Sequence, residues 1–243
     1  MMRVKQLVLC FLVVMVLFSL TGCFEGKNDY SKQGVCIVEN TSLRKEPSTK
    51  GDWISSLALG ETVKLEGSPI KDEADPKVEY IKIKLSDGTK GYASNWCIVG
   101  GAYVGVIQKT TKIYKRPDLL AESNHQFEMM NIVAVEEENE SAWIRVTGEG
   151  RSKKGWIKKE FIRKDKEDVV TAVLLRKALR EKGKTVNNAS REEMEAIVSK
   201  LPYQDSYFVN QVMSKYEEEV YEDEVYEDEE VIVDESEDSF EAE

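Results

Sequence analysis

Residues 80–94, YIKIKLSDGTKGYAS, decide the fold that the sequence predicts. Apolar and polar residues alternate as far as Leu85, which is the period of a strand with one buried face. Ser86-Asp87-Gly88 is a turn signal, and Gly91-Tyr92-Ala93-Ser94 begins the next strand. Two further β segments lie upstream: Val35–Val38, which starts the stretch, and Thr62–Glu66, which also alternates. Short strands separated by polar turns predict a small β-barrel or sandwich.

The same order of segments occurs a second time downstream. Glu79-Tyr80-Ile81-Lys82-Ile83 corresponds to Ala142-Trp143-Ile144-Arg145-Val146, and Lys90-Gly91-Tyr92-Ala93 corresponds to Lys154-Gly155-Trp156-Ile157. Upstream of each pair, residues 41–47 (TSLRKEP) correspond to residues 111–117 (TKIYKRP). This repeated order predicts two copies of one fold. The first copy is longer, and Ser68–Lys77 looks like an inserted loop.

This ordered set resembles the bacterial Src-homology-3-like (SH3b) domain. The family has an apolar-arginine pair before a proline turn, then an aromatic-apolar-basic-apolar strand, then a late Gly-aromatic-apolar segment. Leu43-Arg44 and Pro47-Ser48 match the first feature, although Glu46 stands where glycine is usual. The second copy departs further, since Tyr114 replaces the arginine and no serine follows Pro117. The resemblance covers residues 34–162 and implies a mainly β chain with two small SH3-like barrels.

The alternation also identifies core and binding candidates. In a barrel of about 60 residues, one face of each strand must fill the interior. The expected core residues are Leu65, Ile81, Ile83, Ile144 and Val146. Four aromatic residues accompany them and are the candidate ligand-binding residues: Tyr80, Tyr92, Trp143 and Trp156. They either line a groove or serve as aromatic cover for a small core.

Residues 1–22 have the features of an export signal. Arg3 and Lys5 supply a positive start, and the apolar run Leu7–Leu20 is too short to span a bilayer. Leu20-Thr21-Gly22-Cys23 then resembles the lipobox of bacterial lipoproteins. The resemblance implies cleavage before Cys23, lipidation of its sulfur and acylation of the new N-terminus, with palmitate as the expected chain. An uncleaved anchor or a chance cysteine is the alternative.

Such acyl chains would anchor the chain stably in a membrane, outside the cytosol. Phe24 follows Cys23 in place of the aspartate associated with inner-membrane retention. In a host with two membranes, we therefore expect the outer membrane.

Two other cysteines, Cys36 and Cys97, would face an oxidising compartment in which disulfides persist. The chain ends of SH3-like barrels run close together, so the resemblance implies that these two can form a disulfide. Two buried free thiols are the alternative. His125 is the single histidine and lacks companions at metal-ligand spacing, so we expect an exposed loop residue and neither metal nor cofactor.

Catalytic motifs are absent from the sequence. SH3b domains often accompany NlpC-type cell-wall peptidases or amidases, and such enzymes require a Cys/His/His or zinc constellation. No segment offers one, and neither a Gly-rich phosphate loop nor a serine nucleophile elbow occurs. We therefore expect a protein that is not an enzyme.

The pattern becomes helical from Lys166. Apolar residues recur at three- and four-residue spacing until Gly183: Val169, Val170, Val173, Leu174, Ala178 and Leu179. Ser190-Arg191-Glu192-Glu193 is a capping box that opens a second helix toward Leu201, and a third is expected over Tyr207–Glu219. The helices either pack together or on the second barrel, or they present an apolar face to a partner.

The charge of the chain is divided unevenly. Sixteen of its 45 acidic residues lie in Glu217–Glu243 with no basic residue, so residues 1–216 keep 34 basic and 29 acidic residues, a net charge of +5. Such a density of like charge predicts a disordered tail. The tail attracts cationic partners, divalent ions or the chain's own basic body, or it is simply solvated. Its sign and the compartment disfavour nucleic acid.

The predicted organisation has six parts: 1–22 signal, 23–33 tether, 34–100 first SH3-like domain, 101–164 second SH3-like domain, 165–216 helical segment, and 217–243 acidic disordered tail. The leading hypothesis is a lipid-anchored envelope protein whose barrels bind cell-wall peptide (peptidoglycan) or a protein ligand. The alternative is a surface scaffold or adhesin that acts through its helical segment and tail.

Overall fold

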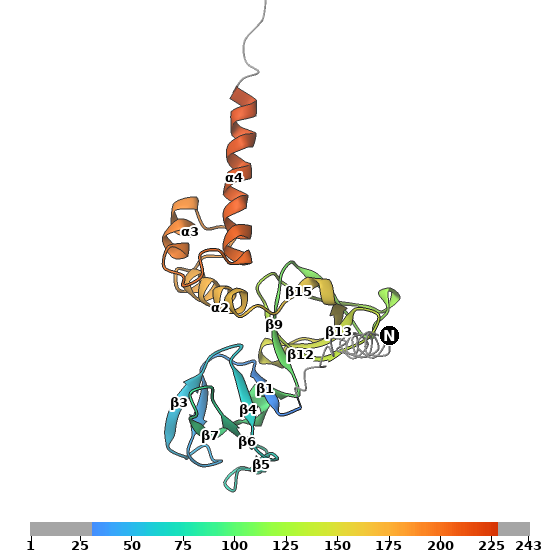
Figure 1. Ribbon diagram of the computed structural model, residues 1–243, viewed down its shortest axis with the longest axis vertical. Coiled ribbons are helices and arrows are strands. Elements are labelled where there is room, and N and C mark those ends of the chain that lie inside the picture. The colour runs from blue at the N-terminus through green and yellow to red at the C-terminus, as the bar shows by residue number, and fades with distance from the viewer. Residues whose placement is uncertain (1–30, 228–243) are drawn as a thin grey trace, which may run out of the picture.

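The structure, a computed structural model, describes residues 31–227. They form two antiparallel sheets that lie side by side, followed by three helices next to them (Figure 1). The chain is thus mainly β, as predicted. The predicted signal, Cys23 and nearly all of the tether lie outside the described residues. Within residues 31–227, no helix is long and apolar enough to cross a membrane.

The two sheets have the same strand order. The first contains β1 (Gln33–Cys36), β2 (Thr41–Arg44), β3 (Trp53–Leu57), β4 (Thr62–Leu65), β5 (Ile70–Lys71), β6 (Glu79–Lys84), β7 (Lys90–Ser94) and β8 (Ile98–Gly100). The second contains β9 (Tyr103–Ile107), β10 (Thr111–Tyr114), β11 (Glu122–Phe127), β12 (Ile132–Glu138), β13 (Trp143–Gly148), β14 (Lys154–Lys158) and β15 (Ile162–Arg163). The order β3-β2-β7-β6-β4-β1-β8 recurs as β11-β10-β14-β13-β12-β9-β15, and β5 is an addition beside β6.

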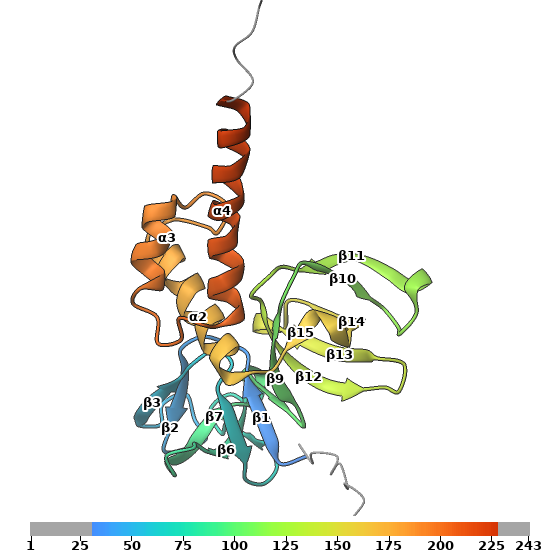
Figure 2. The same ribbon diagram turned by 45° about the horizontal axis from the view of Figure 1, so that its top comes forward.

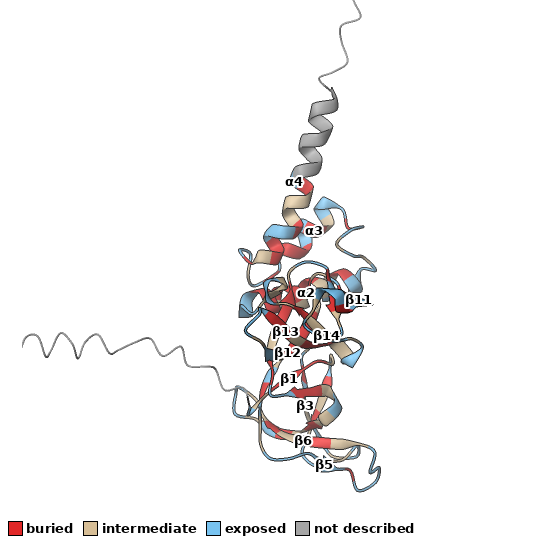
Figure 3. Ribbon diagram, turned by 90° about the vertical axis from the view of Figure 1, so that its right-hand side faces the viewer, coloured by how far each residue is buried: buried red, intermediate tan, exposed pale blue. Residues whose placement is uncertain are grey.

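Each sheet has its own cluster of buried apolar residues. Figure 3 shows where buried residues occur along the strands. Ile81 and Ile83 are buried in the first core with Leu65 packed against it, and Ile144 and Val146 are buried in the second. Four of the five predicted core residues are therefore confirmed, and the fifth, Leu65, is partly buried at the edge of the first core. The alternation of the sequence identified them because a strand directs successive side chains to opposite faces.

The helices are α2 (Lys166–Glu181), α3 (Arg191–Val198) and α4 (Tyr207–Glu227). The predicted capping box is present, since the Ser190 side chain accepts from the Glu193 N–H while the Glu193 carboxylate accepts from the Ser190 N–H. Gly183 follows α2 with a φ of +66°, a conformation that suits glycine at a helix end. The helices pack together and on Val106 and Ile132 of the second sheet.

The third helix corrects the sequence-based boundary. It was expected to end at Glu219 and to give way to a disordered tail, but α4 continues to Glu227. The segment contains neither glycine nor proline, and its glutamates have good helix propensity. Propagation from the packed first turns adds one hydrogen bond for each residue that is fixed, which favours this extension. Residues 228–243 of the predicted tail lie outside the described part.

The two sheets are joined at a packed junction (Figure 2). Val35 of β1 and Ile37, which follows that strand, are buried together with Val99 of β8 and Ala134 of β12. The Arg151 guanidinium, from the turn between β13 and β14, donates to the carbonyls of Trp96 and Ile98 at 2.8 and 2.9 Å.

Helix α2 connects both sheets at this junction. Arg180 donates to the Glu39 carboxylate, at 2.8 Å to its Oε2, and Arg176 donates to the Met130 carbonyl at 3.0 Å. The first contact reaches the first sheet and the second reaches the second sheet. Contacts of one helix with both sheets fix their relative orientation.

Candidate functional site

The outer face of the first sheet carries a row of aromatic and cationic side chains. Because Ile81 and Ile83 point into the core, Tyr80 and Lys82 lie on the opposite face of β6. Across the strands, Lys82 pairs with Tyr92, Tyr92 with Arg44, and Arg44 with Trp53. We call Trp53, Arg44, Tyr92 and Lys82 the first row.

The first row presents both aromatic surface and positive charge to solvent. Trp53 is 62% exposed, and Tyr92 is half-buried. The Lys82 ammonium lies 6.0 Å from the centre of the Tyr92 ring, at the limit of a cation–π contact. Arg44 donates to the Gly51 carbonyl at 2.7 Å, which holds the guanidinium beside the turn that precedes β3.

Tyr80 lies next to this row but is covered. It pairs with Ile70 of β5, so the predicted insertion is a short strand that extends the sheet over Tyr80, which is 5% exposed. Burial raises the pKa of the Tyr80 hydroxyl, while the positive charge of nearby Arg44 acts in the opposite direction. Tyr80 is therefore a buried neighbour of the first row and does not present its ring to solvent.

Asp72 fastens the insertion in this position. Its carboxylate accepts from the backbone N–H groups of Thr49 and Ala74, both at 2.9 Å, and these bonds hold the pKa of Asp72 below its usual value. Ser48 and Thr49 hydroxyls donate to the same carboxylate. The insertion is thus tied to the turn that carries Arg44 and Trp53.

The second sheet has an equivalent row. Tyr114 pairs with Trp156, and Trp156 pairs with Arg145, at the positions that Arg44, Tyr92 and Lys82 occupy in the first sheet. We call Tyr114, Trp156 and Arg145 the second row. Glu122 lies opposite Tyr114, so a carboxylate stands where the first sheet has Trp53. The two rows therefore share their geometry and differ in charge.

Trp143 is the second sheet's counterpart of Tyr80. It is 4% exposed and makes an edge-to-face contact with Tyr114, with ring centres 4.9 Å apart. The Lys158 ammonium lies over the Trp143 ring at 4.3 Å, which is a close cation–π contact. The edge-to-face contact with the buried Trp143 ring thus holds the Tyr114 ring in its orientation.

Gly91 and Gly155 allow the strands that carry each row to approach each other closely. A Cβ at Gly91 would lie 2.7 Å from the Arg44 carbonyl oxygen, and one at Gly155 would lie 2.7 Å from the Tyr114 carbonyl oxygen. These contacts are too short for any side chain, so only glycine lets β7 and β14 approach β2 and β10 so closely. The next residue on each strand, Tyr92 or Trp156, is then placed in its row.

The structure separates the four predicted aromatics into two kinds. Tyr92 and Trp156 are half-buried members of the rows, whereas Tyr80 and Trp143 are buried beside them. None of the four belongs to an inner core, so both initial interpretations apply in part. Their role in ligand binding stays a prediction.

The sequence analysis missed two exposed tryptophans. Trp53 belongs to the first row, and Trp96, which is 55% exposed, lies outside both rows in the short 3-10 turn Asn95–Cys97. The sequence shows polar turn residues just before Trp53, which indicate that a strand begins there. The pairing of Trp53 with Arg44 is visible only in the folded sheet.

The predicted bond between Cys36 and Cys97 is not observed, and both are free thiols. Cys36 is buried in β1, and its sulfur donates instead to the Val38 carbonyl at 3.2 Å. Burial raises the pKa of the Cys36 thiol, which keeps it protonated. This bond joins Cys36 to the residue two positions further along the chain, so the thiol has a hydrogen-bond partner without a disulfide.

The described part of the chain contains no group of three or more His, Cys, Asp or Glu side chains able to hold a metal ion. His125 is exposed, but it lies in strand β11 rather than in the expected loop.

Comparison with known proteins concerns the first sheet. Residues 39–99 match the family model described as "Bacterial SH3 domain". No curated protein matches the chain. Among solved structures, NlpC2 and NlpC1 from Trichomonas vaginalis are similar at 13% and 12% identity, each with a TM-score of 0.25 over 64% of this chain. The matched part spans 56% of the length of those two chains. Residues 39–99 are thus similar to a bacterial SH3 domain, and the second sheet repeats the strand order of the first outside the matched range.

Proposed function

We propose that this chain is a non-catalytic binding protein of the cell envelope, with two SH3-like domains that recognise cell-wall peptide through the first and second rows. The observation that carries the proposal is the recurrence of one cross-strand arrangement, aromatic beside cation, on the outer faces of both sheets. The family match supports the class of ligand for the first domain.

The chemistry of the rows suits such a ligand. Cell-wall peptides carry free carboxylates, which Arg44 and Lys82 attract, and apolar or sugar groups, which pack on indole and phenol rings. Arg44 is held by the Gly51 carbonyl, so little side-chain entropy is lost when it binds. The first row is the more cationic of the two, and we assign the carboxylates of the ligand to it.

Neither row contains a nucleophile beside a general base. The members of both rows are Trp, Arg, Tyr and Lys side chains, which bind and orient but do not supply a hydrolytic pair. We therefore infer that the protein retains its ligand without cleaving it. Incubation of the protein with peptidoglycan followed by chromatography of soluble fragments tests this, and release above a buffer blank would refute it.

The binding test uses residues 24–243 and insoluble peptidoglycan. Trp53→Ala should weaken retention by about 5- to 30-fold, because loss of an interface tryptophan costs about 1–2 kcal/mol. Trp96→Ala is the matched control, since it removes an indole of similar exposure that lies outside both rows. Equal retention of the two variants would refute the role of the first row.

A lipid anchor on Cys23 completes the proposal, and it is supported by the sequence pattern of residues 20–23. It would hold both rows at a membrane surface that faces the wall. Expression of the full chain and of Cys23→Ala, followed by membrane fractionation and mass spectrometry of the N-terminus, tests it. A Cys23→Ala protein that still sediments with membranes would contradict lipidation as the anchor.

A further inference from the structure

Lysines gather on the first sheet, on the side of β6 that lies away from the first row. Lys64 of β4 lies directly opposite Lys84 of β6, and Gln33 of β1 lies opposite Lys64 on its other side. Lys32 continues this pairing outward, since its carbonyl accepts from the Leu65 N–H at 2.8 Å. The first row runs from β6 toward β3, whereas these residues run from β6 toward β1. We call Lys32, Lys64 and Lys84 the lysine cluster.

The lysine cluster lines a surface pocket with a volume of about 340 Å³. Lys32 and Lys64 are exposed and Lys84 is half-buried. Thr62 and Ser86 add two hydroxyl groups to the lining, which contains no carboxylate. The pocket therefore offers three ammonium groups and two hydroxyls to an anion.

The fold itself does not neutralise this charge. Like charges directly opposite each other on neighbouring strands are destabilising, and Lys64 lies opposite Lys84. Among the described residues, no carboxylate forms an ion pair with a member of the cluster, and neighbouring Glu66 pairs instead with Lys90 at 2.9 Å. The hydrogen bond from Lys90, and then the nearby charges of Lys82 and Lys84, hold the pKa of Glu66 below its usual value. One carboxylate shared among these lysines leaves an excess of positive charge.

The lysine cluster lies where the chain enters the first sheet. Cys23 precedes Lys32 by nine residues, and a fully extended chain of that length spans at most about 32 Å. A lipid on Cys23 would therefore keep the start of β1 within this distance of the bilayer. In Figure 2, β1 and β6 lie at the end of the molecule opposite α3. The part of the sheet nearest to the lipid headgroups would thus be the part that carries the cluster.

We propose that the lysine cluster binds the phosphate groups of anionic phospholipids in the membrane that anchors the chain. This inference rests on the lipid anchor of the proposed function. The attraction of each lysine to an anionic bilayer falls off within a Debye length, so the short tether brings the cluster into the range where it acts. The acyl chains retain the protein, and the cluster sets its orientation. The side of the first sheet formed by β6, β4 and β1 then faces the bilayer, with α3 at the far end.

The rate at which each lysine is acetylated on vesicles tests the proposal. Residues 24–243 with an N-terminal hexahistidine tag are held on vesicles that contain a nickel-chelating lipid, so the test does not depend on lipidation of Cys23. The remaining lipid is phosphatidylcholine alone or an equal mixture with phosphatidylglycerol. With phosphatidylglycerol, the lysine cluster should be acetylated about fivefold more slowly, which corresponds to the attraction of one lysine to an anionic bilayer. High salt should remove this difference.

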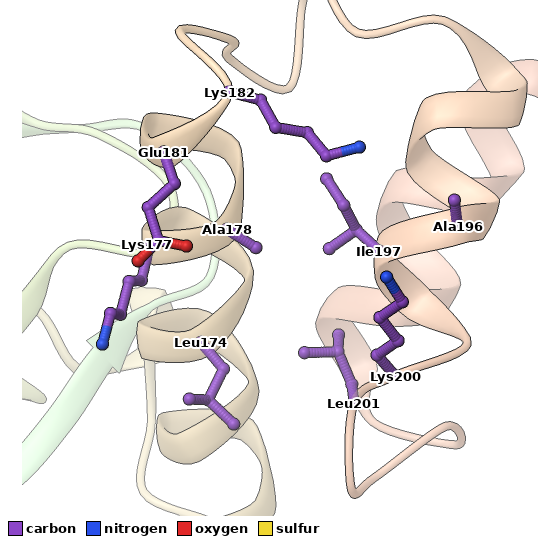
Figure 4. Close-up of a pocket in the computed structure, with 9 residues that line it drawn as sticks. All are labelled: Leu174, Lys177, Ala178, Glu181, Lys182, Ala196, Ile197, Lys200 and Leu201. Atoms are coloured by element: carbon purple, nitrogen blue, oxygen red, sulfur yellow. The ribbon is translucent and has the colours of Figure 1, made fainter.

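The same molecule supplies the control. Lys177, Lys182 and Lys200 are exposed and line the groove between α2 and α3, at the other end of the molecule (Figure 4). Their acetylation should be equal on both kinds of vesicle. Equal slowing of these lysines and of the cluster would show general attraction to the surface and would overturn the proposal.

A variant and a soluble anion complete the test. Joint replacement Lys64→Gln and Lys84→Gln should abolish the slowing at Lys32, whereas Lys177→Gln with Lys200→Gln should leave it unchanged. Unchanged circular dichroism of each variant confirms that its fold is intact. Inorganic phosphate that slows the three cluster lysines equally without vesicles would show that the pocket takes free phosphate, and would overturn the assignment to the membrane. No slowing on either vesicle would also overturn the proposal, and the anchor on Cys23 would still be judged separately by mass spectrometry of the N-terminus.

Discussion

Replacement Gly155→Ala is expected to destabilise the protein more than one methyl group ordinarily would. A Cβ at this position would lie 2.7 Å from the Tyr114 carbonyl oxygen and closer still to Ile113 Cγ2. Favourable contacts between non-bonded carbon atoms lie at about 3.5–4.0 Å. The Tyr114 carbonyl is backbone, so β10 and β14 must separate to admit the methyl group.

The magnitude follows from two opposing contributions. Overpacking of a close contact costs about 3 kcal/mol when the backbone must move, and burial of one methyl group returns about 0.8 kcal/mol. The net loss in free energy of unfolding is about 2 kcal/mol, which lowers the Tm of a chain of this size by about 4–8 °C. The separation also moves Trp156, so retention on peptidoglycan should fall in parallel.

Denaturant and thermal unfolding of residues 24–243, followed by circular dichroism, measure this loss. Gly100→Ala is the control, because its Cβ would meet only the flexible end of the Leu65 side chain, at 3.1 Å. We expect that control to cost less than about 0.5 kcal/mol. If Gly155→Ala proves as stable as Gly100→Ala, the close approach of β14 to β10 is not what requires glycine.

Three further predictions concern stability. Asp168→Ala should cost about 2–3 kcal/mol in denaturant unfolding, because Asp168 is 3% exposed, pairs with Arg163 and accepts from the Tyr207 N–H at 2.8 Å; a loss below that of a surface control would contradict it. Ser190→Ala should cost about 1 kcal/mol through loss of the capping box, with hydrogen exchange faster at the start of α3 than elsewhere. Burial raises the pKa of Glu136, but hydrogen bonds from Thr147 and Lys154 outweigh it and leave the pKa lowered. Its stabilisation is therefore present above the ordinary carboxyl pKa of 4.5 and is lost as the pH falls through the lower folded value; Glu136→Gln should flatten the acid side of the Tm–pH profile.

Local patterns gave much of the fold in advance because the relevant physics is local. Alternation identified Ile81 and Ile83 as core residues, since the geometry of a strand alone decides which side chains share a face. The capping box at Ser190 and the glycine after α2 are likewise contacts between residues close in sequence. Repetition of the pattern predicted a second sheet, and that sheet has the same strand order as the first.

The rest depended on pairing between distant segments. Residues 53–57 (WISSL) show no clear alternation, so β3 and its place beside β2 were not predicted. Without β3, Trp53 had no assigned neighbour and the first row was incomplete. Similarly, the spacing of the cysteines does not reveal that the Cys36 thiol donates to the Val38 carbonyl.

The fixed orientation of the two sheets has a consequence for binding. Were the domains joined by a flexible linker, each row would bind separately, and a second contact would gain only the effective concentration that the linker permits. Here the buried junction, the Arg151 contacts and α2 hold the rows in one arrangement. A ligand long enough to contact both rows loses its translational and rotational entropy when it binds the first row. The second row then adds affinity at little further entropic cost. The different charge of the rows, with Glu122 opposite Tyr114 and Trp53 opposite Arg44, then favours one direction of such a ligand over the other. If the two rows bind one peptide as proposed, their fixed arrangement makes them a single site that distinguishes the ends of that peptide.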